Sequence, residues 1–185
     1  DTVSIVTYAG SDQVVLEGAK GSDSKEIMAA IEDLEAGGST AGSEGIKTAY
    51  EIAGKYFKAD GNNRVILATD GDLNVGITSE GELTRLIKKE KESGVFLSVL
   101  GFGTENIKDN KMEALADNGN GNYSYIDSRF EAKKVLSEEL GANFFTVAKD
   151  VKFQLEFNPK FIKGYRLIGY ENRIMDDEDF KDDTK

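Results

Sequence analysis

Two short apolar runs constrain the fold of this chain more than any other feature. Residues 65–68 and 95–100 are almost continuously apolar, and Gly, Asp or Asn residues lie close to both ends of each run. Such runs are typical of parallel strands that are covered on both faces, whereas strands with one solvent-exposed face alternate between apolar and polar residues. Amphipathic helical patterns at residues 46–57 and from Leu83 onward separate the runs. The chain is therefore predicted to be an α/β protein built from βα units around a mostly parallel sheet.

The segments around these runs extend the same prediction. Residues 2–8 and 14–16 are strand-like and are separated by a Gly-Ser-Asp turn, which predicts a hairpin at a sheet edge. Apolar residues at helical spacing predict further helices near residues 27–34, 112–116 and 135–140. Residues 117–122 are rich in Asn and Gly and are expected to form a turn that enters a strand at 123–126.

The pattern changes near residue 147. Residues 151–157 alternate strictly between apolar and polar, which predicts a half-buried antiparallel strand, and residues 165–170 predict a second one. The last residues, 175–185, carry six acids and two lysines, and such a tail is expected to be disordered or ordered by a partner. We therefore expect an α/β domain at 1–147, a short β region at 148–175 and an acidic tail at 176–185.

Composition excludes several classes of function. The formal net charge of −11 argues against a nucleic-acid partner, because phosphate binding needs a basic surface. Cys and His are both absent, which excludes disulfides, thiolate nucleophiles and sites with imidazole ligands. Any metal site must use oxygen ligands and would suit Mg²⁺, Mn²⁺ or Ca²⁺. No apolar run reaches the roughly 18 residues that a membrane-spanning helix needs.

Two loops contain residues that could carry chemistry. Asp70 directly follows the first buried strand, and ligands of open parallel sheets bind beyond the carboxyl ends of strands. The alternative is that Asp70 caps a turn or a helix. The Gly-rich and hydroxyl-rich loop 37–43, which includes Thr40, precedes a helix and could bind a cation or cap that helix. No Gly-Lys-Ser/Thr follows it, so it is not a Walker A phosphate loop.

The acidic loop after the first buried strand suggests an enzyme as an alternative. The spacing of Asp70 and Asp72 is similar to the paired aspartates of haloacid-dehalogenase phosphatases, in which the first Asp is a nucleophile and the second an acid/base. The same loop is not an EF-hand, because Val75 and Gly81 stand where that motif needs Gly and Glu.

Taken together, several motifs resemble the von Willebrand factor type A domain over residues 1–147. They are Gly38-Ser39-Thr40 before a helix, and residues 67–71, 99–103 and 120–123. The whole chain is similar to bacterial extracytoplasmic proteins in which an A domain is followed by a β region with stretches like 147–152, 156–159 and 166–173. The resemblance implies a Rossmann-like, doubly wound, mostly parallel sheet with an antiparallel edge strand, followed by a short C-terminal β appendage.

The resemblance also implies a metal site. The metal-ion-dependent adhesion site of the family combines an Asp-x-Ser-x-Ser motif after the first strand with one Thr and one Asp, which correspond here to Thr40 and Asp70. It holds Mg²⁺, Mn²⁺ or Ca²⁺ and takes an acidic side chain from a partner protein. Asp-x-Ser-x-Ser does not occur in this sequence. Because residues 1–6 resemble the family's second strand, we expect the first strand and helix to lie upstream of Asp1. We expect this chain to bind metal weakly or not at all.

The function implied by the resemblance is that of a protein-interaction or adhesion module rather than an enzyme, in an extracytoplasmic location. The alternative to a metal-dependent interaction module is a structural scaffold that needs no metal. A sheet without its central first strand would have unpaired edges that invite strand pairing. We expect that gap to be filled by the upstream strand, by a neighbouring chain or by residues 151–157.

Overall fold

The computed structural model describes residues 1–8, 13–35, 42–70, 80–103, 109–139, 141, 151–169 and 174–176. The chain divides into two compact units, Asp1–Phe145 and Thr146–Lys185, and each is described by itself. None of the helices in these ranges is long and apolar enough to cross a membrane.

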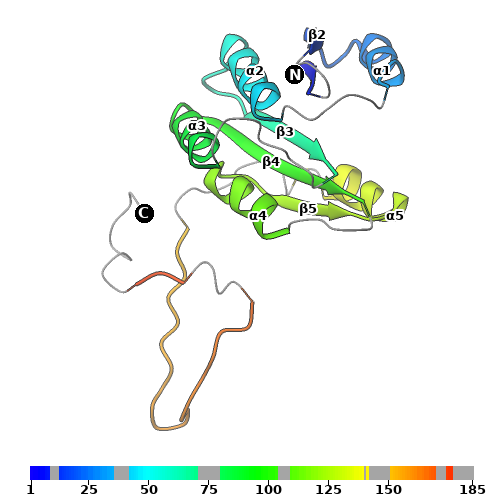
Figure 1. Ribbon diagram of the computed structural model, residues 1–185. Helices are drawn as coiled ribbons and strands as arrows, with labels where there is room; N and C mark the ends of the chain where they lie inside the picture. The colour runs from blue at the N-terminus through cyan, green and yellow to red at the C-terminus, as the bar shows by residue number, and fades with distance from the viewer. Residues whose placement is uncertain are drawn as a thin grey trace. The chain divides into compact units, whose positions relative to one another are not determined.

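The first unit contains the predicted succession of strands and helices (Figure 1). In chain order the elements are β1 (Thr2–Thr7), β2 (Gln13–Lys20), α1 (Ser24–Glu32), α2 (Gly42–Lys55), β3 (Asn63–Thr69), α3 (Glu80–Glu92), β4 (Val95–Phe102), α4 (Asp109–Asn118), β5 (Tyr123–Ile126), α5 (Arg129–Lys133) and a π-helical turn, η1 (Lys134–Glu138). Every strand and helix that we predicted before residue 140 is present.

The strands in the described ranges form two sheets. β3, β4 and β5 make a parallel sheet in that order, and β1 pairs with β2 as an antiparallel hairpin. The buried residues of α2, α3 and α4 pack on one face of the parallel sheet. Val135 of η1 packs on the other face, against Leu100 and Ile126. The predicted α/β fold with a parallel sheet and helices on both faces is therefore confirmed.

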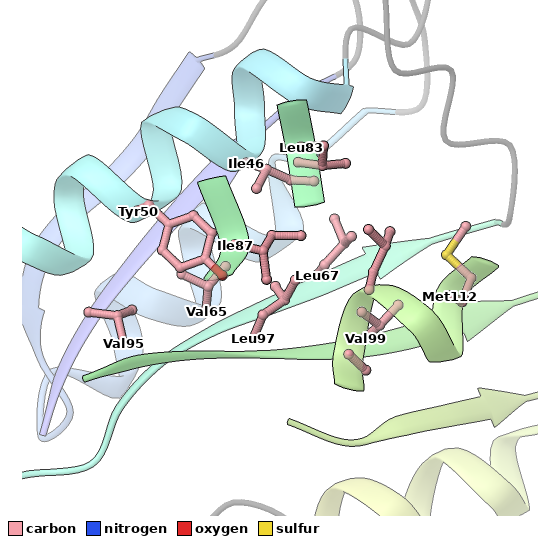
Figure 2. Close-up of a cluster of buried hydrophobic side chains, with 12 residues drawn as sticks. Ile46, Tyr50, Val65, Leu67, Leu83, Ile87, Val95, Leu97, Val99 and Met112 are labelled. Atoms are coloured by element: carbon pink, nitrogen blue, oxygen red, sulfur yellow. The ribbon is translucent and has the colours of Figure 1, made fainter. Parts of the chain in front are cut away.

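The main core lies between the parallel sheet and the helices α2, α3 and α4 (Figure 2). Its buried members are Ile46, Tyr50, Val65, Leu67, Leu83, Ile87, Val95, Leu97, Val99, Met112, Leu115 and Ala116. All but the last residue of β4 are buried, as expected for a central parallel strand. In β3 burial alternates, because only one of its faces is covered in the described part of the chain.

Helix α2 joins the hairpin to the parallel sheet. Near its start, Gly45 lies so close to Tyr8 that a Cβ at this position would be 2.3 Å from the Tyr8 Cβ. At its end, Lys55 forms an ion pair with Glu17 of β2, and the Tyr56 hydroxyl donates to the same carboxylate at 3.3 Å. The core face of α2 packs against β3. The hairpin is thus positioned by the helix rather than by strand pairing.

The edge of β3 that is not bonded to β4 has no strand partner among the described residues. On the uncovered face of β3, Ile66 is 49% exposed. Residues 151–157, one of the three fillings expected for the gap beside β3, form no strand in the described part of the second unit. All three fillings remain predictions.

The described part of the second unit contains a turn but no strand or helix. Asn158 begins the turn, where its carbonyl accepts from the Phe161 and Ile162 amides and its side chain accepts from the Lys160 amide. The rings of Phe157 and Tyr165 then stack with centroids 4.4 Å apart. The predicted strands at 151–157 and 165–170 are therefore not formed in the described part of the unit. A lone pair of strands without a covered apolar face is marginally stable at best, and both segments are exposed.

A buried hydroxyl in the core gives a testable prediction. The hydroxyl of Tyr50 is buried and has no hydrogen-bond partner among the described residues. Burial raises the pKa of the Tyr50 phenol far above its usual range, and the charge of Glu90 adds to this. Because burying an unpaired hydroxyl is costly, Tyr50→Phe is expected to stabilise the protein by about 1 kcal/mol in urea denaturation.

The same substitution is expected to alter the pH dependence of stability. The unfolded chain loses the Tyr50 proton near pH 10, whereas the folded protein keeps it, so wild-type stability must fall above about pH 10. This fall should be smaller in Tyr50→Phe than in Tyr165→Phe, which changes an exposed tyrosine. An equal loss of stability in both variants between about pH 8 and pH 10.5 would contradict the prediction.

Candidate functional site

Asp70 lies where the sequence placed it, directly after the last residue of β3. Its side chain is exposed, whereas the preceding residue, Thr69, is buried. The packing of Val65 and Leu67 in the core positions the strand that Asp70 follows. Asp70 is therefore an exposed carboxylate at the carboxyl end of the parallel sheet.

Tyr8 connects the hairpin to this end of the sheet. Its hydroxyl donates a 2.7 Å hydrogen bond to the Ala68 carbonyl of β3. Burial raises the pKa of the Tyr8 phenol above its usual range; a hydrogen bond with Thr69 lowers the pKa in part, and the negative charge of Asp70 raises it. Tyr8 is therefore a neutral donor beside Asp70 at physiological pH. Sequence reasoning missed Tyr8, because a residue at the end of a hairpin strand carries no local signal for a contact 60 residues away.

The carboxyl ends of the neighbouring strands lie level with that of β3. Thr69 pairs with Gly101 of β4, and Gly101 pairs with Tyr125 of β5. The Tyr125 hydroxyl donates to the Gly103 carbonyl at 2.6 Å, which ties the residue after β4 to β5. Polar groups from three strand ends thus share one edge of the sheet, as expected for a ligand-binding edge of an α/β fold.

The donor set that the structure describes is not a metal site by itself. Thr40, the other predicted ligand, lies outside the described residues, as does Asp72 of the phosphatase alternative. Within the described ranges, no group of three or more acidic side chains could hold a metal ion. Asp70 is a hard oxygen ligand suited to Mg²⁺, but a single protein carboxylate binds such an ion weakly. A tight site at this edge would need further ligands beside Asp70.

The hydrogen bond from Tyr8 to β3 can be tested by removing one atom. Tyr8→Phe keeps the ring against Gly45 and leaves the Ala68 carbonyl without this donor. An intramolecular hydrogen bond typically contributes about 1 kcal/mol net, so the variant is expected to lose about that much stability in urea. Tyr165→Phe is the matched control, because the Tyr165 side chain is mostly exposed. Equal stability of the two variants would show that the Tyr8 hydroxyl does not hold the hairpin.

Two family models match consecutive parts of the chain. Residues 1–139 match the von Willebrand factor type A domain. Residues 142–185 match the C-terminal part of a family named for the uncharacterized protein YfbK. The two matches together account for almost the whole chain.

Known proteins show the same relationship. The uncharacterized protein YfbK of Escherichia coli (strain K12) is 50% identical over 184 residues, which cover 100% of this chain and 32% of that protein. The chain thus spans about a third of the length of the curated relatives that it matches.

Among solved structures, BatB from Bacteroides thetaiotaomicron superposes with a TM-score of 0.60 at 21% identity, over 77% of this chain and 78% of that one. Proximal thread matrix protein 1 of the mussel byssus, solved with a zinc-occupied MIDAS motif, gives a TM-score of 0.58 at 21% identity, over 77% of this chain and 35% of that one. At such identities the likeness establishes the fold alone. The match over residues 1–139 shows that this chain belongs to the von Willebrand factor type A domain family.

Proposed function

We propose that the first unit is a protein-interaction module in which Asp70 contributes to a divalent-cation site that receives an acidic side chain from a partner protein. The observation that carries the proposal is the exposed Asp70 at the carboxyl edge of the parallel sheet, beside Thr69 and the neutral hydroxyl of Tyr8. Thr40, which precedes α2 in the sequence, is the second ligand in this proposal.

Family membership supports this assignment. Von Willebrand factor type A domains generally mediate protein interactions and bind a metal ion at a metal-ion-dependent adhesion site. Mg²⁺ is the ion proposed here, because the chain offers only oxygen ligands and Mg²⁺ keeps several waters that a partner carboxylate can replace. In this proposal the Thr40 loop and other polypeptide supply further ligands beside Asp70. An extracytoplasmic location is proposed on the same family likeness.

The edge of β3 that has no strand partner among the described residues supports a role for that other polypeptide. Unpaired strand edges readily accept a further strand, and α2 contacts both the hairpin and β3, so that it spans the two sheets. We infer that a strand from another segment or another chain pairs with β3 and enters the site beside Asp70. Such a strand would bring further ligands to the same edge of the sheet.

Calorimetric titration with Mg²⁺ tests the metal proposal. This chain is expected to bind with a dissociation constant of about 1 mM or weaker, since one carboxylate and one hydroxyl leave most of the coordination to water. Asp70→Asn should abolish the heat of Mg²⁺ binding at this site. Asp60→Asn, which changes an exposed Asp before β3 begins, at the opposite end of that strand, should leave it unchanged. No difference between the two variants would favour the metal-independent scaffold.

A further inference from the structure

Residues 151–157 of the second unit present an unusual surface. Their apolar side chains are Val151, Phe153, Leu155 and Phe157, and all four are exposed, with Phe153 at 90% and Leu155 at 80%. The residues between them are Lys152, Gln154 and Glu156. In an extended chain, successive side chains point to opposite sides, so the segment has one wholly apolar side and one polar side with a charge at each end.

This pattern is complementary to itself. When two copies of the segment run antiparallel around a twofold axis through Gln154, Lys152 of one copy lies opposite Glu156 of the other, and the same pair recurs on the other side of the axis. On the apolar side, Phe153 lies opposite Leu155. Opposite charges and aromatic–aliphatic pairs directly across antiparallel strands are both stabilising.

From this complementarity we propose that residues 151–157 form an intermolecular antiparallel strand pair with a second copy of this chain. The interaction is isologous, so the same patch serves both copies and the contact closes on itself. Pairing satisfies backbone groups that a strand edge leaves open, and it lets the apolar side chains of the two copies contact one another across the pair. It also accounts for a segment that has the sequence pattern of a strand and forms none within the described part of one chain.

The neighbouring segment is compatible with this pairing. The turn at Asn158 and the stacking of Phe157 on Tyr165 bring the chain back beside residues 151–157. A strand has two edges, so residues 165–168 can lie along one of them and the second copy along the other. The two pairings can be distinguished by experiment. Pairing of residues 151–157 with residues 165–168 of the same chain does not depend on protein concentration, whereas pairing with a second copy does.

A single introduced cysteine tests the twofold axis directly. The chain contains no cysteine, so Gln154→Cys provides one thiol that lies opposite itself in the proposed pair. Cα atoms that face each other across antiparallel strands are about 4.5–5.5 Å apart, which suits a disulfide. Under mild oxidation the full chain carrying Gln154→Cys should form a linked dimer about tenfold faster or more than Lys160→Cys, an exposed residue in the turn. Equal rates would overturn the proposal.

Charge exchange provides the second test. Lys152→Glu and Glu156→Lys each create like-charge pairs within a homodimer, so each should raise the dimer dissociation constant about tenfold in sedimentation velocity. An equimolar mixture of the two variants restores opposite charges across every pair and should recover wild-type association. Lys160→Glu has the same net charge as Lys152→Glu and should not weaken the dimer. A wild-type chain that stays monomeric, or a mixture that does not recover, would overturn the proposal.

Discussion

Gly121→Ala is expected to destabilise the first unit by about 3 kcal/mol, at the upper end of what overpacking costs. A Cβ at Gly121 would lie 1.8 Å from the Leu97 carbonyl oxygen and 2.9 Å from the Ser98 amide nitrogen. The clash is with the backbone of β4, so no side-chain rotation relieves it. The flanking residues are also fixed, because Gly119 and Asn122 accept hydrogen bonds from the amides of Leu97 and Val99.

Gly54→Ala is the matched control for this substitution. Gly54 lies within α2, and a Cβ there would meet no atom within 4 Å. Because Ala favours helices over Gly, this variant should be more stable than wild type by about 0.5–1 kcal/mol. Urea denaturation followed by far-ultraviolet circular dichroism measures both. If the two alanine variants have similar midpoints, residues 119–122 do not pack on β4 as described.

Leu97→Ala is expected to cost about 3–4 kcal/mol, because it removes a fully buried side chain from the centre of the main core. Leu97 is 0% exposed, and its side chain extends from β4 into the main core beneath the helices (Figure 2). Its neighbours come from several elements and cannot all move inward, so a cavity remains. Loss of this size is a large part of the stability of an ordinary domain.

Ile66→Ala on the adjacent strand is the control for core burial. It removes side-chain carbons from a residue that is 49% exposed, so it should cost about 1 kcal/mol or less in the isolated chain. If a further strand or another chain covers this side of β3, the cost of Ile66→Ala rises in that assembly but not in the chain alone. Equal costs for Leu97→Ala and Ile66→Ala in the chain alone would contradict the assignment of the two faces.

The parallel sheet was predictable because its signal is local. Residues 95–100 are apolar except for Ser98 and form most of β4, which is buried on both faces. The turn before β5 was also predictable from its Asn and Gly residues, and Asn120 indeed has a positive φ of 55°. What the composition of this turn could not show is that Gly121 lies against the backbone of β4, because such a contact depends on the neighbouring strand.

The second unit shows the limit of pattern reasoning. Residues 151–157 alternate as well as any strand in the chain, yet they form none in the part that the structure describes. An alternating apolar–polar pattern indicates which side chains a segment could bury. A stable strand also needs a partner strand along its edge and a covered apolar face. The site shows a similar limit: Asp70 follows from its place after a buried strand, but its link to Tyr8 arises only from the packing of the hairpin against α2.

The most direct test of the account locates a bound ion. Addition of Mn²⁺ to the isotope-labelled chain broadens the amide signals near the ion, even when binding is weak. We predict broadening of Asp70 and of the adjoining strand end at Gly101 and Gly103, competition by Mg²⁺, and loss of this broadening in Asp70→Asn but not in Asp60→Asn. Broadening confined to the acidic residues 176–185, or unchanged in Asp70→Asn, would show that this edge of the sheet does not bind divalent cations.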